Sequence, residues 1–201
     1  MLGKRIRRAF GIGVLGLVPL ILPLAFAGVA NAHGYTNNPP SRSYHCKLGN
    51  VSDCGAIQWE PQSVEGPKGF PSRGPSDGEL CSANNSRFAQ LDDQSKAWPK
   101  TNLTSGQRFE FVWTLTAAHA TTKFHYYVTK DGWNPNQPLT RSQLELEPFL
   151  TVPFNGQRPP FTVRHSGTLP AGKSGHHMIY AVWDVADTTN AFYSCSDINF
   201  R

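Results

Sequence analysis

A histidine that becomes the first residue of an exported chain can offer two metal ligands at once, and His33 is placed to do so. A basic start (4–8) and an apolar run (9–29) end in an Ala-Asn-Ala motif at 30–32, the pattern of a secretory signal and its cleavage site. Cleavage after Ala32 leaves His33 first. Its free α-amine and its imidazole could then close a chelate ring on one metal ion, and a third nitrogen would complete a flat site.

His119 is the best candidate for that third nitrogen among the seven histidines, because it directly follows a predicted strand that ends at Ala118. Three nitrogens in a T-shape suit Cu(II), which favours tetragonal nitrogen ligands and binds more tightly than Zn(II). A first-residue histidine left by chance and an ordinary loop histidine would have the same spacing. The spacing alone therefore leaves both interpretations open.

Three other histidines are not assigned to a metal. His176 and His177 imitate a metal site, but successive residues of a strand face opposite ways. His165 lies in another predicted strand and has no partner in the sequence that would suggest a ligand. We therefore expect these side chains to have structural roles.

The apolar run of the leader is almost long enough to span a bilayer, so a membrane anchor is the alternative to a signal peptide. Pro19, Pro23 and the small residues at its end favour cleavage. An Arg-Arg pair in its basic start partly matches a twin-arginine signal, and the export route stays open. We predict a signal peptide at 1–32 and one secreted, extracellular domain at 33–201, with no membrane association after cleavage.

Most of the excess of basic over acidic residues lies in this leader. The sequence has 19 Lys and Arg against 14 Asp and Glu, and the four basic residues of the leader account for all but one of the excess. The rest of the chain has no basic stripe with interleaved aromatic residues that could follow a phosphate backbone. We therefore expect no nucleic-acid partner.

The four cysteines enter an oxidising compartment and most simply form two disulfides, for which three pairings exist. We pair Cys46 with Cys54, which lie close together in a loop region. Cys81 with Cys195 would then tie this loop region to the last predicted strand. A zinc site is the weaker alternative, because the sequence has no C-x-x-C motif.

Two regions of different composition must position these residues. Residues 33–106 are dense in Pro, Gly, Ser and Asn without a sustained period, which predicts a long ordered loop region with a short helix at 86–91. Beyond it, apolar and polar residues alternate as in half-buried strands. The predicted strands are 108–116, 124–128, 146–152, 161–165, 177–185 and 192–200. The chain is thus predicted to be all-β, a single immunoglobulin- or fibronectin III-like β-sandwich with a long N-terminal loop region containing short helices.

Four separated segments carry a family resemblance. They are HGY (33–35), EPQSVEG (60–66), TAAH (116–119) and AVWDVADTTNAFY (181–193). In this order they resemble the bacterial lytic polysaccharide monooxygenases of auxiliary activity family 10, first described as chitin-binding proteins, and the resemblance covers residues 33–201. It implies that His33 and His119 hold one copper ion. It also implies that Phe192 and Ala117 fill the two axial sides of the copper and that Glu65 is a carboxylate near the oxygen site.

The same resemblance implies a flat face that binds a crystalline polymer. The matching residues are Trp59, Glu60, Pro61, Glu65, His119 and Asp187. Trp59 replaces a tyrosine of some relatives and offers an apolar plane for a sugar ring. A partly buried loop tryptophan is the alternative interpretation of this residue.

The implied activity is oxidative cleavage of glycosidic bonds in crystalline chitin, at C1. It would need copper, an external electron donor and O2 or H2O2, and we expect a monomer. A non-catalytic chitin-binding adhesin that uses the same face and a monooxygenase that acts on cellulose are the alternatives. A hydrolase would need two carboxylates that face each other across a sugar cleft, which the sequence does not indicate.

Overall fold

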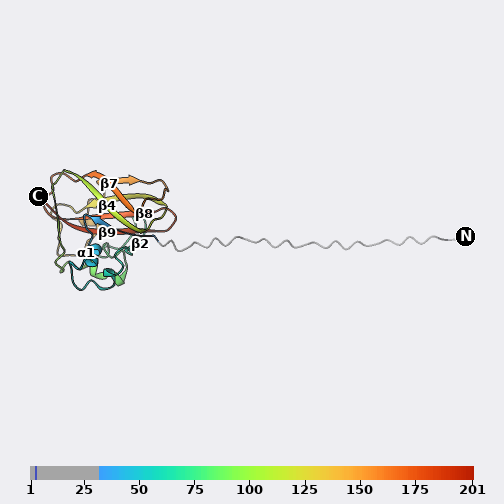
Figure 1. Cartoon of the computed structure of the whole chain (residues 1–201), viewed down its shortest axis with the longest axis horizontal. Coiled ribbons are helices and arrows are strands. Elements are labelled where there is room, and N and C mark those ends of the chain that lie inside the picture. Colours follow the sequence, from blue (N-terminus) through green and yellow to red (C-terminus); the bar gives the residue numbers. More distant parts are fainter. Residues whose placement is uncertain (1–2, 4–31) are drawn as a thin grey trace.

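Two β-sheets form the domain in the computed structural model, which describes Gly3 and residues 32–201 (Figure 1). The predicted signal peptide at 1–32 lies outside the described residues, apart from Gly3 and Ala32. Among the described residues, no helix has the length and apolar character that crossing a membrane requires.

The predicted β-sandwich is confirmed by the order of the strands. The smaller sheet consists, in spatial order, of β1 (His33–Asn38), β4 (Arg108–Ala117) and β7 (Thr162–Thr168). The larger sheet consists of β2 (Glu65–Pro67), β9 (Asn190–Phe200), β8 (Gly175–Val185), β5 (Thr121–Val128) and β6 (Leu150–Pro153). A further strand, β3 (Thr101–Leu103), runs parallel to β9. Apolar side chains from both sheets, including those of Trp113, Phe124 and Trp183, form the core between them.

The strands β4 and β7 follow the alternation that the sequence predicts. Phe111, Trp113 and Leu115 are buried on the inner face of β4, and β7 alternates exposed and buried residues along its whole length. The strand β6 begins at Leu150, whereas the sequence predicts a strand from 146. Pro148, which cannot donate a backbone hydrogen bond, lies in the part that forms no strand.

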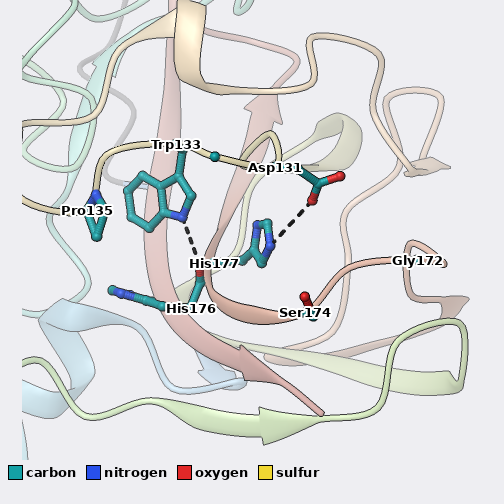
Figure 2. A pocket seen from close by; sticks show the side chains of 8 residues that line it. Asp131, Trp133, Pro135, Gly172, Ser174, His176 and His177 are labelled. Atoms are coloured by element: carbon teal, nitrogen blue, oxygen red, sulfur yellow. Dashed lines mark hydrogen bonds and ion pairs between the residues drawn. The ribbon is translucent and has the colours of Figure 1, made fainter.

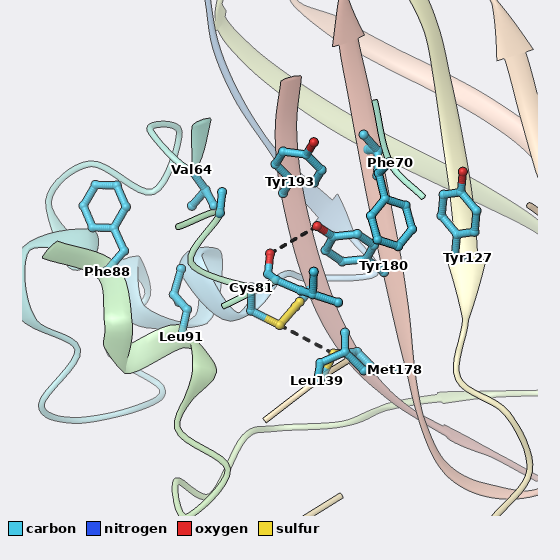
Figure 3. Packing of buried hydrophobic residues seen from close by; sticks show 14 of the residues in the cluster. Val64, Phe70, Cys81, Phe88, Leu91, Tyr127, Leu139, Met178, Tyr180 and Tyr193 are labelled. Atoms are coloured by element: carbon cyan, nitrogen blue, oxygen red, sulfur yellow. Dashed lines mark hydrogen bonds between the residues drawn. A yellow bond between two sulfur atoms is a disulfide. The ribbon is translucent and has the colours of Figure 1, made fainter. Parts of the chain in front are cut away.

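The strand β8 is buried on both faces because the N-terminal loop region covers the outer side of the larger sheet. Ile179 and Trp183 face the core between the sheets. Met178 and Tyr180 face the loop region and pack in a second cluster with residues such as Phe70 (Figure 3). A strand with both faces covered has no polar side, which explains its unbroken burial.

The loop region carries the short helices α1 (Arg42–Lys47), η1 (Gly55–Gln58) and η2 (Ser86–Asp92), and η3 (Arg141–Gln143) lies between β5 and β6. The predicted helix at 86–91 is confirmed as the 3-10 helix η2. Within the predicted loop region at 33–106 the structure also contains the short strands β1, β2 and β3, for which the sequence predicts no element. In β1 three consecutive residues are buried, so no alternation marks the strand in the sequence.

Both predicted disulfides are formed, Cys46–Cys54 and Cys81–Cys195. The second disulfide joins the loop region to β9 and lies within the cluster that contains Met178, Tyr180 and Phe70. There the hydroxyl of Tyr180 donates to the carbonyl of Leu80 at 3.2 Å (Figure 3). The loop region is therefore fixed to the sheet by covalent, apolar and polar contacts together.

A buried ion pair also anchors the loop region. Arg42 of α1 donates to both carboxylate oxygens of Asp197 in β9, at 2.7 and 3.1 Å, and His176 Nε2 lies 2.9 Å from the same carboxylate. Burial raises the pKa of Asp197, but the charge of Arg42 and the hydrogen bonds from His176 and Arg42 outweigh it and hold this pKa below its usual value. The helix α1 is thus tied to the last strand by a charged contact.

Candidate metal centre

The pairing of β1 with β4 brings the two predicted ligands to one end of the smaller sheet. His33 lies opposite Ala117 in this antiparallel pair, and His119 follows two residues beyond Ala117. The close approach of β1 depends on Gly34. A Cβ atom there would come within 2.5 Å of a methyl carbon of Leu115 and 3.2 Å of the Trp183 ring. Glycine therefore lets the strand that carries His33 lie directly on the core.

His119 is oriented through one of its two ring nitrogens. Its Nδ1 lies 3.4 Å from Oδ2 of Asp187, which leaves Nε2 to face another partner. The ammonium of Lys68 donates to the carbonyls of Val185 and Thr188, the latter at 2.6 Å, so it clamps the loop on both sides of Asp187. The loop that carries Asp187 is thus held by Lys68, the residue directly after β2.

Phe192 is a buried ring beneath His33. The two ring centroids are 6.2 Å apart at an interplanar angle of 52°. Phe192 is fully buried and leans on Trp183, with 5.1 Å between the ring centroids. Because a phenyl ring offers no donor atom, this side of His33 is apolar.

Glu65 reaches the same end of the domain through the larger sheet. It lies opposite Phe192 in the pairing of β2 with β9, and its Oε1 accepts a hydrogen bond from the Asn190 side chain at 2.9 Å. Its side chain is half-buried. Direct contacts thus join Ala117, His33, Phe192 and Glu65 in one continuous group, which His119 adjoins.

The donor set of this end fits copper on one condition. Across residues 32–201, no group of three or more His, Cys, Asp or Glu side chains is arranged to hold a metal ion. Two imidazoles therefore need a third donor from the main chain, and the nitrogen of His33 qualifies only as a free amine. In the uncut chain Ala32 precedes His33 and is buried, and cleavage after Ala32 would convert the amide nitrogen of His33 into a free amine. Three nitrogens in a plane are a ligand set that Cu(II) favours.

The residues of the predicted polymer face differ in exposure. Trp59 follows η1 and is 82% exposed, which contradicts the interpretation as a partly buried residue. Glu60 is half-buried and paired with Arg87, and Asp187 is exposed. Pro61 is buried, so its side chain packs inside the loop and is not part of the exposed surface. The same loop is joined to β1 by a hydrogen bond from Gly34 N to Gln62 O of 3.0 Å.

The histidines left without a metal have other contacts. His165 Nδ1 lies 2.7 Å from the Tyr126 hydroxyl, and burial lowers the pKa of His165 to about 4, so it is neutral in the core. His176 and His177 lie at the end of β8 farther from the candidate centre, beside a hollow that also involves Asp131 and Trp133. Their side chains point in opposite directions, as the strand geometry predicts (Figure 2).

Sequence reasoning gave no role to three residues that shape this end. Lys68 and Asn190 act through hydrogen bonds to the Asp187 loop and to Glu65, and only the folded sheet brings them there. Phe161 was predicted as the first residue of a strand, but β7 begins at Thr162 and Phe161 is exposed. The sequence signal that could indicate an exposed Phe161 is its position directly after two prolines.

The family described as "Lytic polysaccharide mono-oxygenase, cellulose-degrading" matches residues 33–198. "GlcNAc-binding protein A" of Shewanella oneidensis is 49% identical, over 85% of this chain and 36% of its own length. "AA10 family lytic polysaccharide monooxygenase C" of Mycosarcoma maydis is 48% identical, over 93% of this chain and 58% of its own length. The chain therefore spans 36% and 58% of the lengths of these two relatives.

Two solved structures cover the domain in full. An AA10 lytic polysaccharide monooxygenase from Streptomyces lividans is 60% identical, with a TM-score of 0.83 over 84% of this chain and 100% of its own. A Bacillus amyloliquefaciens CBM33 in complex with Cu(I) is 42% identical, with a TM-score of 0.78 over the same shares. The fold and the family of the domain are thus both matched.

Proposed function

Because the chain belongs to the lytic polysaccharide monooxygenases of auxiliary activity family 10, we propose that its domain is a secreted copper enzyme that oxidatively cleaves glycosidic bonds in crystalline chitin. The observation that carries this proposal is the group of His33, Ala117, Phe192 and Glu65, joined by strand pairing and ring contact, with His119 beside it. The relative with bound Cu(I) supports copper as the metal.

His33 and His119 would hold the copper, His33 through its amine and imidazole and His119 through Nε2. When bound, copper supplies the one-electron redox chemistry that activates O2 or H2O2, with electrons from an external donor. Asp187 keeps the His119 ring in its orientation through Nδ1. The cut after Ala32 creates the amine, so signal cleavage is part of the assembly of the site.

The remaining residues would shape the space around the metal. Phe192 would offer no ligand atom on its side of the copper, and Ala117, which pairs with His33, would place only a methyl group beside it. Glu65 is anchored by Asn190 through one carboxylate oxygen, so the second oxygen can exchange a proton with the oxygen co-substrate. The apolar wall formed by Phe192 also keeps bulk water away from this side.

Chitin is the proposed substrate because several relatives are named GlcNAc-binding protein A. An exposed Trp59 beside polar side chains suits a flat array of sugar rings, whose CH faces stack on an indole and whose polar groups form hydrogen bonds. We assign C1 as the oxidised carbon, so the new chain end would be a lactone or aldonic acid. We propose that the secreted domain acts as a monomer.

Cellulose is the second candidate substrate, because the matching family is described as cellulose-degrading. A non-catalytic adhesin is the alternative from another class, and the binding proteins among the relatives are its support. Both polymers expose flat faces, so the geometry of Trp59 suits either.

Mass spectrometry of the released products separates these possibilities. The protein that begins at His33 is loaded with copper and incubated with β-chitin or cellulose, with and without ascorbate. C1-oxidised chito-oligosaccharides that need both copper and ascorbate are the expected result. Oxidised cello-oligosaccharides alone would identify cellulose, and not chitin, as the substrate. Tight binding without oxidised products from either polymer would favour the adhesin.

A further inference from the structure

Phe161 is a second large aromatic side chain exposed beside the candidate metal centre. It is 65% exposed, and among the exposed large apolar residues only Trp59 exceeds it in the part of the chain that the structure describes. Its backbone is fixed, because its carbonyl accepts a hydrogen bond from Leu115 N of β4 at 2.7 Å. An exposed ring on a fixed backbone is a feature of binding surfaces.

Hydrogen bonds give the order of segments across this end of the domain. The Trp59 loop is joined to β1 through Gly34 N and Gln62 O, and β1 pairs with β4 where His33 meets Ala117. On the other side of β4, the segment 158–161 leads into β7. Neighbouring strands lie about 4.8 Å apart, so the metal residues lie between Trp59 on one side and Phe161 on the other.

A hollow of about 350 Å³ joins Phe161 to the metal residues. Its lining comes from two segments, 116–119 of β4 and the following turn and 158–161 before β7. Because Ala117 and His119 line it, the hollow is continuous with the candidate centre. Its other walls are Arg158, two prolines and Phe161, so the segment 158–161 contributes mainly apolar side chains and one charged group.

The segment 158–161 is held in place before any ligand arrives. Arg158 donates from Nε to the carbonyl of Ala118 at 2.7 Å, and Thr121 N donates to Gln157 O at 2.9 Å. Pro159 and Pro160 fix two further φ angles. A surface that is ordered in advance loses little conformational entropy on binding.

Arg158 adds polar capacity to this apolar surface. It is exposed, and its terminal guanidinium nitrogens form no hydrogen bond with any of the described residues. These N–H groups can donate to hydroxyl or carbonyl oxygens of a ligand. An exposed ring beside a fixed donor suits a sugar ring, which has CH groups on its faces and polar groups at its edge.

We propose that Phe161, Pro160 and Arg158 form a second contact for the polysaccharide, on the opposite side of the metal centre from Trp59. The inference rests on the proposed function and deepens it, since a polymer surface held on both sides would lie across His33 and His119. Phe161 and Pro160 contact the CH face of a sugar ring, and Arg158 donates to its oxygens. The occupant is a neutral polysaccharide surface, because the ring and the hollow present no charge except Arg158.

Binding of the copper-free protein to β-chitin tests the contact without any catalytic step. Phe161→Ala is expected to weaken binding about threefold to tenfold, as for the loss of one aromatic contact. Leu146→Ala is the matched control, since Leu146 is 42% exposed and its neighbour Glu145 bonds to the other end of β5. Phe161→Trp should restore binding, and an unchanged melting temperature should accompany each variant.

Footprinting of the wild-type protein gives a measurement that needs no variant. Radiolytic hydroxyl radicals label exposed side chains, and β-chitin should protect Phe161 and Trp59 but leave Leu146 labelled. Unprotected Phe161 together with wild-type affinity of Phe161→Ala would overturn this inference while the proposed function stands. A wild-type protein that neither binds nor oxidises chitin or cellulose would overturn the proposed function, and the second contact with it.

Discussion

The Nδ1 atom of His119 lies 3.4 Å from a carboxylate oxygen of Asp187, and the ammonium of Lys68 holds the loop that carries Asp187 by donating to the carbonyls of Val185 and Thr188. A carboxylate on one ring nitrogen fixes the tautomer and the direction of the other nitrogen. The orientation of one predicted copper ligand therefore depends on a chain of two contacts from the larger sheet.

Asp187→Asn is expected to weaken Cu(II) binding about tenfold, because the amide holds the imidazole less firmly than the carboxylate. Competition titration with a copper chelator measures the effect in the protein that begins at His33. Asp53→Asn is the control, since Asp53 is an exposed acid of the loop region at φ 55°, a conformation that asparagine tolerates. Equal affinities of the wild type and Asp187→Asn would show that this contact does not orient His119.

Retention of Ala32 should remove tight copper binding. The peptide bond to Ala32 turns the His33 amine into an amide, which no longer offers a lone pair to the metal. A chain that begins at Ala32 and one that begins at His33 differ by this one residue and are compared by calorimetry and by EPR of the Cu(II) form. The same affinity and the same spectrum for both chains would contradict the three-nitrogen site.

His119→Ala should abolish oxidation and leave chitin binding largely intact. The substitution removes one of three nitrogens, while the hydrogen bond from the Thr121 hydroxyl to the His119 carbonyl can remain, so the turn is kept. Product analysis after ascorbate addition and a binding assay on β-chitin measure the two effects separately. Oxidised products at the wild-type rate would exclude His119 as a copper ligand.

Part of the fold could be predicted from the sequence because some strands have one face exposed to solvent. The alternation in β4 and β7 reports that asymmetry directly, and the disulfide from Cys81 to Cys195 followed from the need to fix the loop region. The strand β1 escaped prediction because Gly34, Tyr35 and Thr36 are all buried. A strand covered on both sides and poor in large apolar residues has no periodic signal.

The candidate site was predictable where local sequence carries the chemistry, as in the cleavage motif before His33. Contacts that depend on tertiary packing could not be predicted from the sequence. Lys68 is 119 positions from Asp187 in the sequence, and only the pairing of β2 with β9 brings its ammonium to that loop. The sequence predicts Phe161 as a strand residue, because aromatic residues are common in strands and the sequence does not show that this ring is exposed.

Trp59→Ala should weaken chitin binding about tenfold and keep the affinity for Cu(II). The exposed indole is expected to supply one large stacking contact, and it lies outside the metal ligands. With less polymer held over the centre, the reduced enzyme should oxidise its own residues, chiefly His33 and His119. Peptide mapping after ascorbate treatment checks this, and both histidines unmodified in the variant would count against catalysis.

A last prediction concerns the stability of the loop region, which depends on a buried acid. Asp92 accepts hydrogen bonds from Cys81 N at 2.9 Å and Ser82 N at 3.2 Å. Burial raises its pKa to about 6, against the opposing effect of these hydrogen bonds and of Arg42. The folded state therefore binds this proton more tightly than the unfolded state, in which the pKa is about 3.9. The free energy of unfolding should fall as the pH rises from about 4 to about 6.

Asp92→Asn replaces the titrating carboxyl group with an amide that does not titrate in this range. The amide oxygen can still accept both backbone hydrogen bonds. A shift of about two pKa units corresponds to at most about 3 kcal/mol, so the variant should gain up to that amount over the wild type by pH 7 and little at pH 4. Urea unfolding at several pH values between 4 and 7, with the disulfides intact, measures the difference. Asp53→Asn should run parallel to the wild type, because its carboxylate is exposed. If Asp92→Asn also runs parallel, the buried carboxyl does not take up a proton in this range, and its two backbone hydrogen bonds outweigh its burial.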